Sequence, residues 1–396
     1  MSDFINFLKS LRPLNKEEKE LFGLIRKFCS KDEIKILERL YKQQIISLSI
    51  TSLNILNNTF TFPSIKLNEA YENHKQDNSY PDNFAFIKYL TKKVKDKVNV
   101  QISKSIAKDP FALTKFIAPN IVGMDYVKKA ALLILFAKDP FHILLLGDPG
   151  TGKTDILRSV HDLAPVSSFG LGSGTTGVGL AVSVKGKEIQ KGLLPLADNG
   201  ICCIDELNLM KEENRASLYN AMEKGFVTYD KGGNHIKFDA RVRVIATANP
   251  DGDKFDGNTI KELRKQLPFD SALLTRFHLV FLIRKPSFNE FKEITKKIIR
   301  GTKIKLDVNT LSIIRDYIRQ SWMLNITIPE TLESDIVDFV QELKLNENNY
   351  LIEISPRLVV GIVRMAKALA RMKLKTRVTK QDLAIVKEIV KYSLKI

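Results

Sequence analysis

Apolar positions along this chain follow two different periods, and each period predicts a different kind of structure. In the first hundred residues apolar side chains recur every three or four positions, which is typical of amphipathic helices. We expect such helices at residues 16–29, 32–47 and 83–97. The stretch 54–79 is rich in Asn and holds one short β-like piece at 59–65. This pattern predicts a mainly helical N-terminal domain over residues 1–108.

Beyond residue 108 short apolar runs alternate with helical segments, beginning with a helix at 125–137. Such alternation, which continues to about Ile283, is typical of a parallel α/β sheet. After Pro286 the helical period returns. It predicts helices at residues 288–300, 309–323, 329–343, 356–372 and 379–393. We therefore expect an α/β core over residues 109–285 and a helical lid over 286–396.

A glycine-rich loop after the apolar run 143–146 carries the clearest chemistry. Its residues are Gly147, Asp148, Pro149, Gly150, Thr151, Gly152, Lys153 and Thr154. A G-x-x-x-x-G-K-[ST] loop between a strand and a helix is a P-loop, which binds nucleoside triphosphates through backbone N–H groups and the helix N-terminus. Lys153 is expected to reach the β- and γ-phosphates of ATP, and the Thr154 hydroxyl to ligate Mg²⁺. The flanking strand and helix disfavour the alternative, a plain Gly/Pro turn.

A second apolar run, 201–204, ends in the adjacent carboxylates Asp205 and Glu206. The carboxyl ends of parallel strands are where α/β sheets bind ligands. Asp205 is expected to hold the hydration shell of Mg²⁺, and Glu206 to orient and activate the attacking water. An apolar run ending in Asp-Glu is common by itself, but its place after Lys153 with helices between favours the catalytic interpretation.

Two further polar residues follow later strands and helices. A third strand ends at Asn249, where an amide can hydrogen-bond the γ-phosphate or the lytic water, or simply begin an Asn-Pro turn. Arg276 follows a short apolar helix. An arginine there is usually a solvated charge, but in a ring-shaped ATPase it can enter the neighbouring subunit's site and stabilise transition-state charge.

The net charge of +17 bears on what the chain could bind. The excess of Lys and Arg is +7 over residues 1–115, +3 over 116–285 and +7 over 286–396. Basic flanks favour nucleic acid through counterion release, although a lysine-rich proteome would give the same excess. Three cysteines without a C-x-x-C pair, no membrane-length apolar run and no signal peptide predict a soluble intracellular protein.

The order of these parts is that of a known family. Residues 109–382 resemble the AAA+ module of the MCM replicative helicases. The resemblance rests on the segments 109–110, 117–119, 122–123, 128–130, 147–154, 205–210, 214–215, 221–223, 248–250, 270–277, 355–358 and 370–372. Leu-Leu-Thr-Arg-Phe at 273–277 and Ala-Arg-Met at 370–372 are the more specific pieces, because all AAA+ proteins share the nucleotide motifs.

The resemblance implies a role for each matching residue. Lys153 and Thr154 would serve phosphate and Mg²⁺, and Asp205 and Glu206 catalysis. Asn249 would be sensor 1. The resemblance also implies roles for three arginines. These are Arg276 as the arginine finger and Arg357 as sensor 2, each serving a neighbour's nucleotide, and Arg215 as an additional phosphate sensor.

Two segments resemble the pore loops of this family. Residues 225–238 match the pre-sensor-1 β-hairpin and read as two alternating strands around a Gly-Gly tip. In MCM proteins the lysine at the position of Lys231 lines the ring channel and contacts DNA phosphates; the alternative is a turn lysine that serves solubility. The glycine-rich segment 168–178 resembles the entrance to the helix-2 insert, a second pore loop, or else is a flexible surface linker.

Several positions depart from the family pattern. MCM proteins usually carry Ala at the position of Gly152 and Ser at the position of Thr154. They usually have an acidic residue in place of His278, a lysine in place of Leu209 and a histidine in place of Tyr219. Residues 1–108 are too short for the MCM N-terminal region with its oligonucleotide-binding barrel and zinc module, and they lack zinc-ligand spacing. After the lid we expect no added winged-helix domain. We therefore expect a reduced or specialised MCM, such as those of mobile elements and viruses.

The sequence thus predicts a homo-hexameric, ATP-driven helicase that translocates on DNA with little sequence preference. Two other functions stay open. One is a protein-remodelling AAA+ ATPase of the chelatase/MoxR branch, which shares both insertions and would lack DNA-stimulated hydrolysis. The other is a replication initiator or loader that uses ATP only as a switch and would not displace strands.

Overall fold

The computed structural model describes residues 15–42, 46–55, 58–67, 81–185, 188–231, 234–252, 254–257, 259–286, 288–299 and 307–395. The chain divides into two compact units, Met1–Lys108 and Asp109–Ile396.

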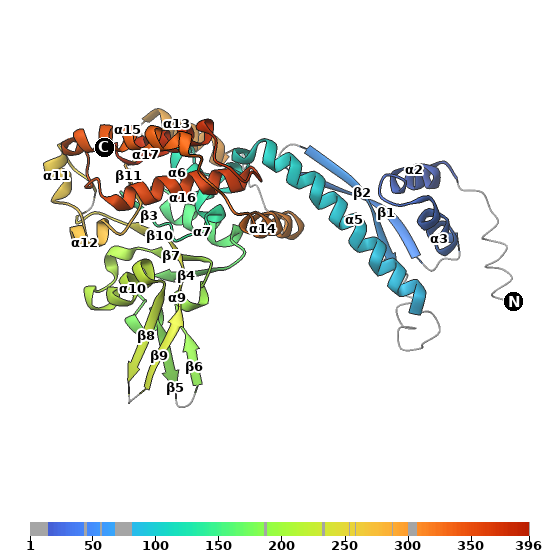
Figure 1. Ribbon diagram of the computed structural model, residues 1–396, viewed down its shortest axis with the longest axis horizontal. Coiled ribbons are helices and arrows are strands. Elements are labelled where there is room, and N and C mark those ends of the chain that lie inside the picture. Colours follow the sequence, from blue (N-terminus) through green and yellow to red (C-terminus); the bar gives the residue numbers. More distant parts are fainter. Residues whose placement is uncertain are drawn as a thin grey trace. The chain divides into compact units, whose positions relative to one another are not determined.

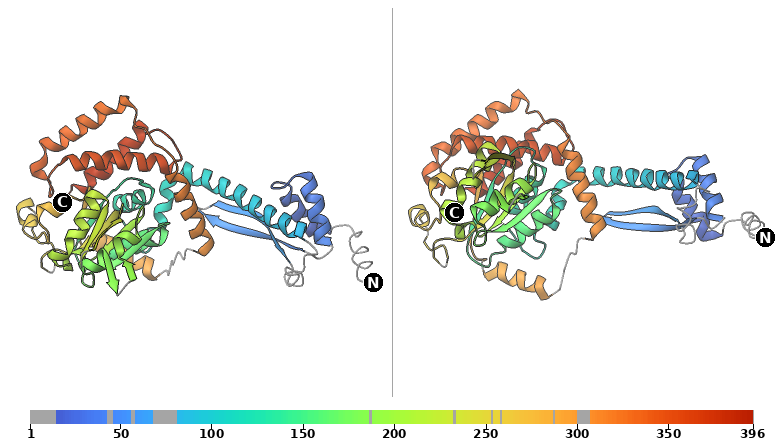
Figure 2. Two further views of the ribbon diagram at one scale, coloured as in Figure 1. Left: turned by 60° about the horizontal axis from the view of Figure 1, so that its bottom comes forward. Right: turned by 90° about the horizontal axis from the view of Figure 1, so that it is seen from below.

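The first unit combines helices with a β-hairpin. Its elements are α2 (Lys16–Ile25), α3 (Lys31–Lys42), β1 (Ile46–Ile55), β2 (Asn58–Leu67) and α5 (Pro81–Lys108). The two strands are antiparallel, and the long helix α5 runs beside them (Figure 2). The core of the unit lies between these elements, where Phe22, Leu37 and Leu90 are buried.

The hairpin is the main difference from the sequence-based expectation for this unit. The helix expected at 32–47 ends at Lys42, and the β-like piece at 59–65 belongs to the ten-residue strand β2. In β1 the apolar residues Ile46, Leu48 and Ile50 alternate with serines, a period of two that favours a strand over a helix.

The second unit is built around a five-stranded parallel sheet in the order β11-β3-β10-β7-β4. The strands are β3 (Ile143–Gly147), β4 (Ser167–Leu171), β7 (Ile201–Asp205), β10 (Arg243–Ala248) and β11 (Leu279–Ile283). Counted along the chain, the order across the sheet is fifth, first, fourth, third, second. Strands β3 and β7 are wholly buried, which explains their unbroken apolar runs.

Helices cover this sheet and continue into the lid. Before the lid come α6 (Asp125–Phe136), α7 (Lys153–Leu163), α10 (Ala216–Lys224), α11 (Ile260–Arg264) and α12 (Ser271–Leu274). The lid consists of α13 (Phe288–Ile299), α14 (Val308–Trp322), α15 (Glu333–Leu345), α16 (Pro356–Met372) and α17 (Lys380–Ser393), and α16 and α17 pack on α6. The expected α/β core with a helical lid is therefore confirmed.

Two hairpins interrupt the alternation of strands and helices. The first, β5 (Val182–Lys185) with β6 (Glu188–Lys191), lies between the short helices α8 (Gly177–Leu180) and α9 (Leu193–Leu196). The second is β8 (Phe226–Lys231) with β9 (Asn234–Asp239). Both leave the unit on the same side (Figure 1).

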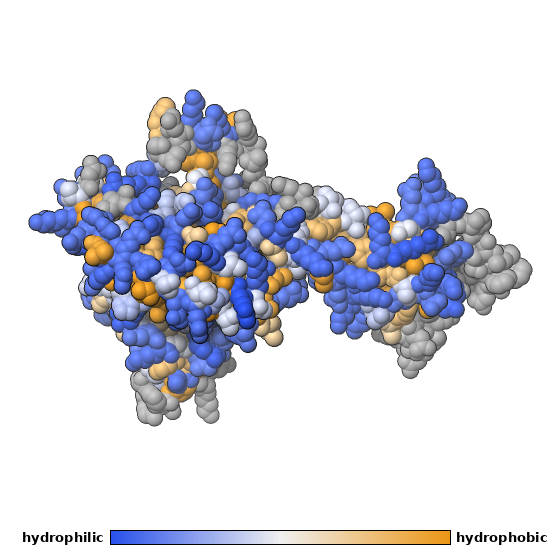
Figure 3. Space-filling model, turned by 45° about the horizontal axis from the view of Figure 1, so that its top comes forward, coloured by the Kyte–Doolittle hydropathy of each residue, from blue (hydrophilic) through white to orange (hydrophobic). Residues whose placement is uncertain are grey.

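On the face drawn in Figure 3 hydrophilic side chains cover most of the described surface. Most apolar side chains of the sheet are buried, whereas the lid leaves Phe288, Phe291 and Leu345 exposed. None of the helices among the described residues combines the length and apolar character that crossing a bilayer requires.

Candidate active site

The P-loop connects the end of β3 to α7 and borders a cavity of about 360 Å³. Gly150 and Gly152 have φ values of +77° and +85°, which disfavour any residue with a side chain. A Cβ at Gly152 would also lie 2.5 Å from the Ile121 side chain. The cavity is lined by residues 149–155, Ile121, Asp205, Glu206, Thr247 and Asn249.

Lys153 is almost entirely buried in this loop, with 6% of its surface exposed. Its ammonium donates to the carbonyls of Gly147 at 2.8 Å and Asp148 at 2.7 Å. Burial lowers the pKa of Lys153 to about 8, and the nearby carboxylates oppose that shift only in part. The position therefore holds a cation whose charge an anionic ligand would stabilise.

Asp205 is the centre of a hydroxyl network at the end of β7. Its Oδ1 accepts from the Thr247 hydroxyl at 2.5 Å and from the Thr154 hydroxyl at 3.2 Å. The Thr247 oxygen in turn accepts from the backbone N–H of Glu206 at 2.8 Å. A hydroxyl and a carboxylate oxygen at this spacing fit the oxygen ligands that Mg²⁺ prefers.

Glu206 sits in the left-handed region with φ of +53°, a strained conformation for a residue with a side chain. The Thr247 hydroxyl accepts from this backbone and helps to hold Glu206 in the lining of the cavity. Sequence reasoning missed Thr247, although it lies two residues before Asn249 on the strand that was predicted. It also missed Asn208, whose Oδ1 accepts from the Asn249 backbone N–H at 3.1 Å.

The structure turns one predicted ligand residue away from the cavity. The Asp148 carboxylate accepts from the backbone N–H groups of Phe255 at 2.7 Å and Lys285 at 3.0 Å, and it is 4% exposed. Asp148 thus ties the P-loop to the segment that precedes the lid, and its side chain is not placed to bind nucleotide. The pattern of the motif alone does not distinguish these two roles.

The glycine-rich segment 168–178 begins in β4, which pairs with β7 in the sheet, and continues past the end of β7. Gly172 donates its N–H to the Asp205 carbonyl at 2.7 Å, and a Cβ there would lie 2.1 Å from the Glu206 carbonyl oxygen. The segment then leads into α8 and the β5–β6 hairpin. The segment that the resemblance assigns to the entrance of an insert therefore contacts the backbone of Asp205 and Glu206 at Gly172.

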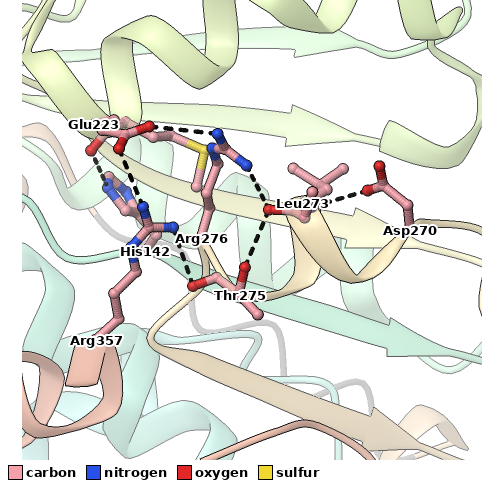
Figure 4. A network of polar contacts seen from close by, with 9 residues as sticks. His142, Glu223, Asp270, Leu273, Thr275, Arg276 and Arg357 are labelled. Atoms are coloured by element: carbon pink, nitrogen blue, oxygen red, sulfur yellow. Dashed lines mark hydrogen bonds and ion pairs between the residues drawn. The ribbon is translucent and has the colours of Figure 1, made fainter. Parts of the chain in front are cut away.

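Arg276 and Arg357 lie together, away from the P-loop cavity of the same chain. They come from the end of α12 and the first turn of α16, and both point toward Glu223 of α10 (Figure 4). Each guanidinium approaches one carboxylate oxygen of Glu223 at 3.4 Å. We call Arg276, Arg357 and Glu223 the arginine cluster.

The arginine cluster borders a second cavity, of about 200 Å³. His142, His278 and Arg364 are among the other residues that line it. Burial lowers the pKa of His142 to about 3 and that of His278 to about 2, so both imidazoles are neutral at physiological pH. Among the described residues that line this cavity, Glu223 is the one carboxylate, and it lies with three arginines.

The structure places the two remaining predicted residues outside both cavities or leaves them undescribed. Arg215 donates through Nε and Nη2 to the Met210 carbonyl and stacks over the Phe269 ring, so it lines neither cavity. Lys231 pairs with Asn234 at the end of the β8–β9 hairpin. The placement of the Lys231 side chain and of the tip, 232–233, lies outside the described residues.

This sheet order, P-loop and helical lid together define an α/β AAA+ P-loop module. The chain belongs to the MCM family: residues 99–301 match the MCM P-loop domain, and residues 312–394 match the MCM AAA-lid domain.

Individual relatives agree with this assignment. The minichromosome maintenance protein MCM of Saccharolobus solfataricus is 32% identical over 309 residues, which are 70% of this chain and 44% of the relative. The DNA replication licensing factor mcm7 of Schizosaccharomyces pombe is 32% identical over 67% of this chain and 39% of its own length. The DNA replication licensing factor MCM4 of Arabidopsis thaliana is 31% identical over 68% of this chain and 35% of its own length. The chain thus spans less than half the length of these relatives.

Proposed function

We propose that this chain is an ATP-driven DNA helicase that works as a homo-hexameric ring. One observation carries the proposal: the residues predicted to bind and hydrolyse ATP line two separate cavities of a single chain. Lys153, Asp205 and Glu206 line one cavity, and Arg276 and Arg357 line the other. The halves complete each other when the P-loop of one subunit meets the arginine cluster of the next, which is a heterologous contact that closes into a ring.

In the proposed reaction, Lys153 neutralises the β- and γ-phosphates of ATP. Thr154 and Asp205 would hold Mg²⁺, which would spread the charge that develops on the phosphate oxygens. Glu206 takes a proton from water as the water oxygen bonds to the γ-phosphorus and the bond to the β–γ bridging oxygen breaks. Asn249 orients that water, and Arg276 and Arg357 of the adjacent subunit stabilise the departing charge.

The output of the reaction would be motion of the two hairpins along DNA. Both hairpins leave the P-loop unit on the same side (Figure 1). The segment that leads to the β5–β6 hairpin contacts the backbone of Asp205 and Glu206 at Gly172. Lys231 would contact backbone phosphates from the end of β8. Because phosphate contacts carry no sequence information, binding is expected to be independent of sequence and sensitive to salt.

The test compares ATP hydrolysis and strand displacement by the full chain with and without single-stranded DNA. We expect DNA to stimulate hydrolysis. In Lys231→Ala we expect basal hydrolysis within about twofold of wild type but at least about tenfold less unwinding and a shallower salt dependence of DNA affinity. The matched control is Lys237→Ala on the same hairpin, where the ammonium rests 4.0 Å from the centre of the Phe226 ring.

The outcomes separate the alternatives. Hydrolysis that DNA does not stimulate, with no unwinding of any substrate, would favour a protein-remodelling ATPase. Stimulated hydrolysis without strand displacement would favour an initiator or loader. Full unwinding by Lys231→Ala would remove this lysine from the DNA path.

A further inference from the structure

Glu223 occupies a position that joins the arginine cluster to the β8–β9 hairpin. It is the next-to-last residue of α10, and Gly225, with φ of +73°, ends the helix so that β8 begins one residue later. Gly225 also accepts from the backbone N–H of Ala240 at 2.8 Å, which ties the two ends of the hairpin together. A shift of the Glu223 end of α10 would therefore move the base of the hairpin.

The same face of α10 holds Arg276 by two contacts. Tyr219 and Glu223 are four residues apart and so lie on one side of the helix. The guanidinium of Arg276 stacks over the Tyr219 ring at 4.5 Å and approaches Glu223 at 3.4 Å. Arg276 thus rests on α10 at two successive turns, while Arg357 reaches the other oxygen of Glu223 from the lid.

The geometry of these ion pairs allows another anion to replace the Glu223 carboxylate as the partner of the two arginines. The side chain of Glu223 is 47% exposed and that of Arg357 is 37% exposed, so a ligand can reach both. Among the described residues, the buried Nε of Arg276 has no hydrogen-bond partner. A terminal phosphate carries more negative charge and more acceptor oxygens than one carboxylate, so it can take both arginines from Glu223.

We infer that Glu223 is a positioning residue that couples the neighbour's nucleotide to the β8–β9 hairpin of its own subunit. The inference rests on the proposed action of Arg276 and Arg357 across subunits. With no phosphate at the subunit face, Glu223 holds the arginines and keeps α10 in place. When a neighbour's γ-phosphate takes the arginines, α10 is released and the hairpin moves with it. By linkage, DNA that displaces the hairpin frees the arginines for catalysis.

The first test measures hydrogen exchange of the hairpin amides at a protein concentration where sedimentation shows assembly. Wild type and Glu223→Gln are each compared with and without a slowly hydrolysed ATP analogue. We expect the analogue to change exchange in β8 and β9 of wild type by at least about threefold, and in Glu223→Gln by clearly less. No change in wild type, or an equal change in the variant, would overturn the coupling.

The second test uses basal hydrolysis, because loss of the competing carboxylate should free the arginines. Glu223→Gln is expected to raise basal hydrolysis about threefold and to lower the DNA stimulation ratio by a similar factor. Glu223→Asp, which keeps the charge, should restore part of the ratio, and the control Glu213→Gln should behave as wild type. Lower hydrolysis with an unchanged ratio would mean that Glu223 only supports the fold. A hairpin response to nucleotide without any effect of DNA would sustain the coupling and reject the DNA motor.

Discussion

The P-loop cavity and the arginine cluster are two halves of one proposed catalytic site, yet they are built in opposite ways. Lys153 and Asp205 are 6% and 5% exposed and are fixed by hydrogen bonds of 2.5 to 3.2 Å. The side chains of Arg276, Arg357 and Glu223 are 21%, 37% and 47% exposed, and both ion pairs span 3.4 Å. Buried hydrogen bonds hold one geometry, whereas partly exposed ion pairs are weak enough to be exchanged.

The difference indicates a division of labour. The residues that line the P-loop cavity are held in place without a second subunit, because the hydrogen bonds of Asp205 and Thr247 are made within one chain. The arginine half has a partner within the chain that a neighbour can replace. A site divided in this way can bind nucleotide in each subunit and still depend on assembly for rapid hydrolysis.

The strongest test of this comparison removes the proposed base from the buried half. Glu206→Gln keeps the shape of the cavity and should bind ATP normally, but turnover should fall by about a thousandfold because the amide cannot accept the proton of water. ATP affinity and steady-state hydrolysis are the measurements. The control Glu212→Gln changes an exposed carboxylate outside the cavity. Hydrolysis near the wild-type rate would place the base elsewhere.

The next test asks whether the two halves meet across subunits. Arg276→Ala and Lys153→Ala subunits should each be nearly inactive alone, and mixing them should restore activity. In an equal mixture about one interface in four joins an intact P-loop to an intact arginine cluster, so up to about a quarter of the wild-type rate is expected. Absence of recovery at every ratio, in assemblies shown to exchange subunits, would mean that Arg276 acts within its own chain.

A third test addresses the network that holds Asp205 and Glu206. Thr247→Val keeps the volume of the side chain but removes the hydroxyl that bonds to both residues. We expect a 10- to 100-fold loss of hydrolysis, about the value of hydrogen bonds to a charged group, with a smaller effect on ATP affinity. Thr247→Ser, which keeps the hydroxyl, should retain most of the activity. Equal activity in Thr247→Val would show that the strand alone positions the carboxylates.

The sequence was a good guide to the buried half and a poorer guide to the rest. The P-loop and the Asp-Glu pair follow buried strands whose apolar runs are visible in the sequence, and the lid helices have clear periods. The structure puts residues 356–372 in α16 as expected. Thr247 could be predicted from its spacing. It lies two residues before Asn249, and side chains two apart along an extended segment point to the same face of the sheet.

Other features depend on contacts between distant segments and leave no local pattern. The Asp148 carboxylate bonds to backbone groups of residues 255 and 285, more than a hundred positions away. Glu223 meets Arg276 and Arg357 only because α10, α12 and α16 converge. In the first unit, apolar and polar residues alternate in β1. The helical spacing of the residues just before β1 extends the predicted helix into this strand, so the sequence does not predict the hairpin.

The smallest expected effect concerns pH and tests how deeply the P-loop half is buried. Burial lowers the pKa of Lys153 to about 8 in the nucleotide-free chain, and bound phosphate should raise it. Below pH 8 the ammonium is charged in both states, so ATP affinity should be flat. Above pH 8 the free chain loses the proton that the complex needs, so affinity should fall, by about tenfold between pH 7 and pH 9.

The control is Lys153→Arg, which stays charged throughout this range and reports any titration of ATP itself. The difference between the two pH profiles therefore belongs to Lys153. If the two profiles are parallel, the lysine keeps an ordinary pKa, and the contrast between a desolvated half and a solvated half loses its electrostatic basis.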